Sequence, residues 1–111
     1  LSPHGQAERS RNSQISMAAF DSLGMCWFTF INGAHDLLFP MINALYGLNW
    51  KEEQYFQMGK EMIRMEIGFN RKAGLGVEQE QMPQWIIDEA LPPTNAKFDV
   101  PYEDYQKVWK N

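Results

Sequence analysis

The chain has one cysteine in 111 residues, and this scarcity limits the chemistry that it can perform alone. A single sulfur excludes both a disulfide within the chain and a metal site built from two cysteines. A reducing cytoplasm is the expected location for such a chain. Apolar runs are also short. The longest candidate, Leu23 to Ile31, falls far below the roughly 20 residues that cross a bilayer, so no membrane partner is expected.

Basic residues are few as well. Ten Lys and Arg side chains stand against fourteen Asp and Glu side chains, which gives a formal net charge of −4. Phosphate backbones are bound through clustered basic residues, so no nucleic-acid partner is expected. Glycine-rich phosphate loops and serine nucleophile elbows are absent from the sequence, and we single out no catalytic residue.

The sequence is rich in core-forming side chains, since 44% of its residues are hydrophobic and 14% are aromatic. This composition and length predict one domain over residues 1–111, with residues 1–11 and 105–111 free to fray. Between residues 12 and 50 only Asp21 and Asp36 are charged. We expect this charge-poor segment to be buried on several sides. Two sources of cover stay open: a partner outside the chain, or the rest of a self-sufficient helical bundle.

Apolar periodicity predicts helices and no alternating strands. The first helix is expected over residues 12–23, ended by Gly24, because Ile15, Ala19 and Leu23 recur every fourth position and Met17 and Phe20 widen their apolar stripe. The apolar run over 25–31 fits either a buried helix or a buried strand. A helix over 37–45 is expected, with Asp36 as its cap, Pro40 in its first turn and Gly47 after its end.

The strongest pattern predicts a long helix from Trp50 to about Lys72, with Asn49 as its N-cap and Glu52 reaching back. Its apolar stripe is expected to lie in the core; it consists of Tyr55, Met58, Met62, Met65 and Phe69. Residues 74–100 are expected to form a loop with at most a turn around 85–90, and Pro101 to begin a last helix through Trp109. The predicted fold is all-α, an irregular helical bundle with a long C-terminal loop that contains Pro and Gly.

Most polar residues have an ordinary interpretation. His4 and His35 lack the paired spacing of metal ligands, and we expect both to be structural or exposed to solvent. No sequence feature desolvates the acidic pairs Glu52–Glu53 and Glu78–Glu80, so these side chains are expected to face water.

The segment Asp21-Ser22-Leu23-Gly24-Met25-Cys26 is different, because three functional residue types meet in charge-poor surroundings. The Asp21 carboxylate can accept N–H groups of a heterocycle, and a Cys26 thiolate can ligate iron. Gly24 permits a sharp turn that we expect to expose the amides of Met25 and Cys26. The ordinary alternative is an inert buried thiol at Cys26 and a local helix-end hydrogen bond at Asp21.

This hexapeptide resembles a motif of the tungsten-containing aldehyde ferredoxin oxidoreductases, whose pattern is Asp-x-x-Gly-Leu-Cys. Phe28 follows at the family's offset. The segment Ile42-Asn43-Ala44-Leu45-Tyr46-Gly47 resembles the family's Leu-Asn-Ala-x-x-Gly. Residues 66–74 resemble its Glu-x-x-Phe-Asn-x-Arg-Glu-Gly, and Met82-Pro83 and Leu91-Pro92 lie where the family has proline turns.

The resemblance implies the C-terminal part of a larger multidomain enzyme that oxidises aldehydes to carboxylic acids at a tungsten- or molybdenum-pterin centre. Electrons would pass through a [4Fe–4S] cluster to ferredoxin. By position, Asp21 would hydrogen-bond a pterin, the backbone of Leu23, Gly24 and Met25 would line its pocket, and Cys26 would be a cluster ligand.

Such a cluster takes four thiolates. The other three would come from upstream domains of the same polypeptide, so no cofactor and no activity are expected of the isolated chain. A homo-oligomer would fit the same picture. The alternative function is a small all-α protein-interaction module without catalytic activity.

Overall fold

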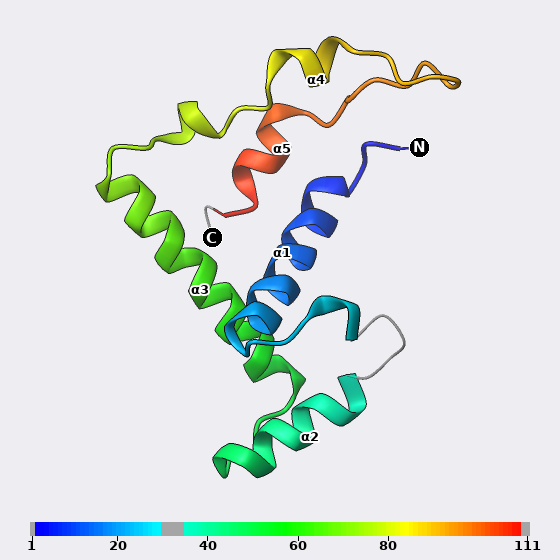
Figure 1. Ribbon diagram of the computed structural model, residues 1–111. Helices are drawn as coiled ribbons and strands as arrows, with labels where there is room; N and C mark the ends of the chain where they lie inside the picture. Colours follow the sequence, from blue (N-terminus) through cyan, green and yellow to red (C-terminus); the bar gives the residue numbers. More distant parts are fainter. Residues whose placement is uncertain (1, 30–34, 110–111) are drawn as a thin grey trace. The chain divides into compact units, whose positions relative to one another are not determined.

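The structure is a computed structural model, and it describes residues 2–29 and 35–109. In chain order the elements are α1 (Gln6–Ser22), the 3₁₀ helix η1 (Trp27–Thr29), α2 (His35–Tyr46), α3 (Glu52–Lys72), the 3₁₀ helix η2 (Val77–Glu80), α4 (Gln84–Asp88) and α5 (Tyr102–Lys107) (Figure 1). Across the described ranges there is no strand, only an isolated antiparallel bridge between Leu91 and Ala96. The all-α prediction is confirmed.

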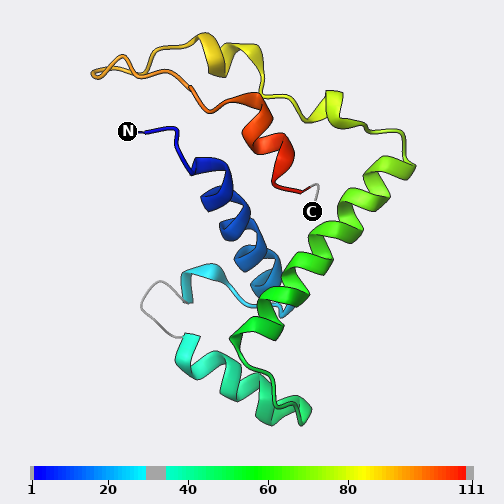
Figure 2. The same cartoon turned by 180° about the vertical axis from the view of Figure 1, so that it is seen from behind.

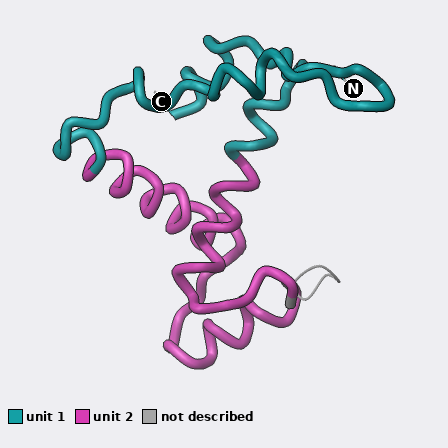
Figure 3. The backbone as a smooth tube through the Cα atoms, turned by 45° about the horizontal axis from the view of Figure 1, so that its top comes forward, with its two compact units in different colours: residues 1–11, 70–111 teal, residues 12–69 magenta. Residues whose placement is uncertain are grey.

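The chain divides into two compact units (Figure 3). One unit consists of residues 12–69 and contains most of α1, η1, α2 and most of α3. The other combines residues 1–11 with residues 70–111. The single domain over 1–111 stays a prediction.

The core of the 12–69 unit is a cluster of aromatic and aliphatic side chains. Its buried members are Phe20, Leu38, Phe39, Ile42 and Tyr55, and five half-buried residues pack on them: Leu23, Met25, Trp27, Leu48 and Trp50. The Phe39 and Tyr55 rings stack with centroids 4.1 Å apart. Because one aromatic comes from α1, one from α2 and one from α3, this cluster joins all three helices.

The second half of α1 crosses the first half of α3, as two opposite views show (Figures 1 and 2). Gly59 allows a very close approach at this crossing. A Cβ built on Gly59 would lie 2.2 Å from the Ile15 carbonyl oxygen and 2.9 Å from the Ala19 nitrogen. Any larger side chain would therefore push the two backbones apart.

An amide clamp closes the turn between α2 and α3. The Asn43 Nδ2 donates to the Trp50 carbonyl oxygen at 2.8 Å, and the Trp50 N–H donates back to Asn43 Oδ1 at 3.1 Å. The buried Tyr55 hydroxyl donates to the same Oδ1 at 2.8 Å. One amide on α2 thus fixes both the turn and the first part of α3.

The helix limits differ from the predicted ones at several ends. α1 begins at Gln6 rather than residue 12, because its first turn is held locally: the Gln6 N–H donates to the Pro3 carbonyl and the Arg9 guanidinium to the His4 carbonyl. α2 begins at His35, so the predicted cap Asp36 lies inside the first turn and Pro40 lies inside the helix. Of the run over 25–31, predicted as a buried helix or strand, residues 27–29 form η1 and residues 30 and 31 lie outside the described part of the chain. The predicted burial is wrong for Phe28, which is 79% exposed.

The predicted N-cap of α3 is also wrong. α3 begins at Glu52, and the side chain of Gln54 accepts the Lys51 N–H at 2.8 Å, so Lys51 occupies the cap. The clamp explains the shift, because the N–H and the carbonyl of Trp50 are bonded to the Asn43 side chain instead of taking part in the first turn of α3. Tyr55 of the predicted stripe is buried and Met58 and Met62 are half-buried, but Met65 and Phe69 are exposed, so the core prediction fails for these two.

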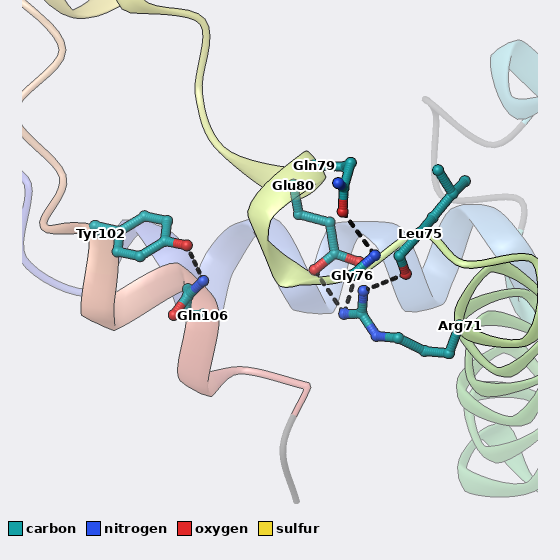
Figure 4. A network of polar contacts seen from close by, with 7 residues as sticks. All are labelled: Arg71, Leu75, Gly76, Gln79, Glu80, Tyr102 and Gln106. Carbon is teal, nitrogen blue, oxygen red and sulfur yellow. Dashed lines mark hydrogen bonds and ion pairs between the residues drawn. The ribbon is translucent and has the colours of Figure 1, made fainter.

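In the unit of residues 1–11 and 70–111, polar contacts hold the turn after α3 (Figure 4), and the Arg11 guanidinium lies 5.3 Å from the centroid of the Trp109 ring. The Arg71 guanidinium donates to the Leu75 carbonyl at 2.8 Å and pairs with the Glu80 carboxylate at 2.9 Å. The predicted loop over 74–100 includes the short helices η2 and α4. Pro101 precedes α5 instead of occupying its first position, and α5 ends at Lys107 rather than at Trp109.

Burial of the Tyr55 hydroxyl leads to a prediction for alkaline pH. Desolvation raises its pKa above the ordinary 10.0, so above that pH the unfolded chain loses the proton before the folded chain does. This contribution to stability is complete below pH 10.0 and falls as the pH rises through it, by at most about 1.4 kcal/mol per pH unit. Urea unfolding at about pH 9 and about pH 11 should show a steeper loss for the wild type than for Tyr55→Phe. Equal losses would contradict the assignment.

Candidate functional site

The candidate site lies at the C-terminal end of α1, where the helix gives way to a tight turn. Gly24 has φ +68°, a left-handed conformation that favours glycine. The Met25 N–H donates to the Phe20 carbonyl at 3.1 Å, and the Gly24 N–H donates to the Asp21 carbonyl at 3.0 Å. These two bonds define a Schellman motif, which ends α1 as the glycine predicts.

The turn places the two chemically active side chains on the surface. Asp21 is exposed on the last turn of α1, and Cys26 is exposed immediately before η1. Cys26 is therefore not buried, which rules out the ordinary alternative of an inert buried thiol. The structure thus presents a carboxylate and a thiol five residues apart, on either side of one rigid turn.

The residues between them contribute through their backbone. Leu23 and Met25 direct their side chains to the core cluster, against which both pack. A Cβ added at Gly24 would have no atom within 4 Å, so the space beside the turn is open. An approaching group could contact the backbone of residues 23–25 there without moving other parts of the chain.

One expectation about this turn is wrong. Gly24 does not expose the amide of Met25, because the Met25 N–H is already bonded to the Phe20 carbonyl. The Leu23 N–H is also bonded to that carbonyl, at 3.1 Å. The hydrogen bonds that end α1 therefore use the N–H groups of residues 23–25, which would otherwise be able to donate to a ligand.

The other candidate residues do not form a site. His4 is exposed, and the side chain of His35 lies outside the described part of the structure. Glu52, Glu53, Glu78 and Glu80 are all exposed, and Glu80 pairs with Arg71. Within residues 2–29 and 35–109 no group of three or more His, Cys, Asp or Glu side chains could hold a metal ion. Any metal at Cys26 would need further ligands from outside this part of the chain.

Two residues that stabilise the fold, Asn43 and Gly59, were not among the residues predicted to be important. Asn43 occurs within the Asn-Ala motif, and its signal is a lone amide in a largely apolar helix. Gly59 interrupts a strong helical pattern, which usually has a packing reason. Both residues support the unit that carries the turn, because Gly59 lies against α1 and Asn43 contacts α3 through Tyr55.

No helix in the described ranges is long and apolar enough to cross a membrane.

Comparison with known proteins gives a consistent result. A family model described as aldehyde ferredoxin oxidoreductase, domains 2 and 3, matches residues 1–111. The chain is 32% identical over 76 residues to the tungsten-containing aldehyde ferredoxin oxidoreductase of Pyrococcus abyssi. It is 33% identical over 76 residues to the protein of the same name from Thermococcus kodakarensis. Each match covers 68% of this chain but only 12% and 13% of the respective relative. No solved structure matches the chain.

Proposed function

The chain belongs to the aldehyde ferredoxin oxidoreductase family, and from that premise we propose that it is one part of a longer oxidoreductase that converts aldehydes to carboxylic acids. In this proposal the turn after α1 forms one wall of a tungsten- or molybdenum-pterin site and supplies one ligand to a [4Fe–4S] cluster. When bound, the metal-pterin centre would supply the two-electron chemistry of aldehyde oxidation. Electrons would leave through the cluster to ferredoxin.

The observation that carries the proposal is the joint exposure of Asp21 and Cys26 beside the open turn at Gly24. Iron–sulfur clusters are held by deprotonated cysteine, so Cys26 must be accessible and ionised to act as a ligand. The exposed position of Cys26 meets the first requirement. The three remaining thiolates would come from the part of the polypeptide outside these 111 residues.

Asp21 would position the pterin. A carboxylate accepts two N–H groups of a heterocycle in parallel, which fixes both the distance and the orientation of the ring. Because Asp21 belongs to the last turn of α1, the helix fixes its backbone relative to the turn. The backbone of Leu23, Gly24 and Met25 would contact the same ligand through the open space at Gly24.

The test uses the whole polypeptide, purified with its cofactors. Cys26→Ser should abolish the visible absorption of the cluster and lower the iron content, because a hydroxyl is a poor replacement for a thiolate. In the same series, Asp21→Asn should weaken pterin retention about tenfold, the effect of losing roughly 1.4 kcal/mol of charge-assisted hydrogen bonding.

Ser22→Ala is the matched control, because Ser22 lies between the two and its hydroxyl only bonds the Ala18 carbonyl within α1. This variant should keep iron, absorption and pterin at wild-type levels. A cluster that survives Cys26→Ser unchanged would refute the ligand assignment. It would then favour the alternative function, an all-α interaction module without a redox role.

A further inference from the structure

α2 is apolar on both its inner and its outer side. Its inner residues Leu38, Phe39 and Ile42 are buried in the core cluster. On the outer side, Leu37, Met41 and Leu45 are 69%, 64% and 74% exposed. These three residues recur every fourth position, so they form one stripe along the helix, which we call the outer α2 face. A helix that is apolar all round is normally covered all round.

The composition of α2 is typical of a covered surface rather than a solvated one. Asp36 is its only charged residue, and it contains no Lys or Arg. Helices that lie on membrane surfaces pair their apolar face with a strongly basic polar face, which α2 lacks. Depletion of charge and enrichment of Met and large apolar residues are instead typical of the buried centre of a protein interface.

We propose that the outer α2 face docks onto the part of the same polypeptide that lies outside these 111 residues. The inference rests on the proposed function, in which this chain is one part of a longer enzyme. The relatives provide the length of chain that this requires, because the matched stretch spans only 12% to 13% of their sequences.

The position of the candidate site favours this occupant over a second copy of the chain. A cluster at Cys26 needs three thiolates from outside, and a second copy would bring only another Cys26. The neighbouring Trp27 packs on Phe20 with ring centroids 5.2 Å apart, within the core cluster that α2 lines from its inner side. The segment that reaches Cys26 must therefore approach the unit that carries α2.

The chain contains a natural matched pair of probes for this docking. Met41 lies on the outer α2 face, and Met65 lies on α3 with a similar exposure of 58%. Met65 borders a charged side chain on its own side of α3, because the exposed Glu61 lies one helical turn before it. Hydroxyl radicals oxidise methionine to the sulfoxide according to the accessibility of the sulfur.

The experiment exposes the full polypeptide to a microsecond pulse of hydroxyl radicals and measures both sulfoxides by peptide mass spectrometry. Relative to the unfolded protein, Met41 should be oxidised at least about tenfold more slowly, while Met65 stays within about twofold. Oxidation of native Met41 within about twofold of its unfolded rate would overturn the proposal. Protection that disappears on dilution to the monomer would also overturn it, because the occupant would then be a second copy.

A pair of variants tests the face directly. Leu45→Glu should restore the oxidation of Met41 to within about twofold of the unfolded rate, since the new charge cannot be buried at an apolar contact. Leu45→Met retains the apolar surface and should leave Met41 protected. Continued protection in Leu45→Glu would refute the assignment of this face.

The visible absorption of the same samples separates this inference from the proposed function. A cluster that is present while Met41 reacts freely would refute the docking face alone. Protected Met41 in a protein whose cluster survives Cys26→Ser would refute the site alone.

Discussion

Replacing Gly59 with alanine is expected to lower the free energy of unfolding by about 3 kcal/mol, at the upper end of the usual cost of overpacking. The new Cβ would lie 2.2 Å from the Ile15 carbonyl oxygen and 3.0 Å from the Ala19 Cβ. Two of the three nearest atoms belong to the α1 backbone, which cannot rotate away as a flexible side chain can. Separation of α1 from α3 would also loosen the aromatic cluster between Phe20 and Tyr55.

The same helix offers a matched control. Gly68→Ala is the identical chemical change in α3, but a Cβ at Gly68 would have no atom within 4 Å. Alanine costs less conformational entropy than glycine in a helix, so this variant should gain about 0.5 to 1 kcal/mol. Urea unfolding followed by far-ultraviolet circular dichroism measures both changes. A midpoint that stays unchanged or rises in Gly59→Ala would show that close packing at Gly59 does not control stability.

Asn43→Leu is expected to have a similar effect, about 3 kcal/mol, because it removes a polar side chain that bonds three groups at once. The Trp50 N–H and carbonyl lose their side-chain partner, and the buried Tyr55 hydroxyl exchanges its 2.8 Å acceptor for the more distant Phe39 carbonyl at 3.3 Å. Each polar group left without a partner costs about 1 to 3 kcal/mol, reduced at Trp50 where water has partial access. The leucine volume restores none of these bonds.

The control for this variant is Asn49→Leu, the same change at an exposed position in the same turn. It should alter the free energy of unfolding by less than about 0.5 kcal/mol. Combining Asn43→Leu with Tyr55→Phe should cost less than the sum of the single changes, because the two residues share a hydrogen bond. Strict additivity would indicate that this bond contributes nothing to the clamp.

Local signals explain which parts of the fold can be predicted from sequence. Gly24 ends α1 as expected, because a left-handed residue at a helix end depends only on its immediate neighbours. The start of α3 cannot be found in this way. Lys51 rather than Asn49 caps the helix, because Asn43, a residue of the preceding helix, holds the backbone of Trp50.

Periodicity has a related limit on α3. It identifies a stripe from Tyr55 to Phe69, but it does not say how far along the helix other residues cover that stripe. Tyr55 lies under Phe39 of α2, whereas Met65 and Phe69 lie beyond the cover of the described residues. Side-chain spacing predicts the direction of a face, and only the tertiary arrangement decides its burial.

The candidate site shows the same division between local and distant information. The turn at Gly24 follows from the residues themselves, whereas the roles of Asp21 and Cys26 come from the family resemblance and stay predictions. The motif Asp-x-x-Gly-Met-Cys does not reveal that the amides within it are internally bonded. That property depends on helical geometry immediately before the turn.

The hydrogen bonds within this turn limit the kind of ligand that the proposed site could bind. The N–H groups of Leu23, Gly24 and Met25 all donate to carbonyl groups of α1. The exposed side chains beside the turn, Asp21 and Cys26, therefore offer a ligand the lone pairs of carboxylate oxygens and of sulfur. A phosphate or another anion would find no free N–H donor among residues 23–25. Under the proposed function, the ligand would therefore present N–H groups or a cation to these lone pairs.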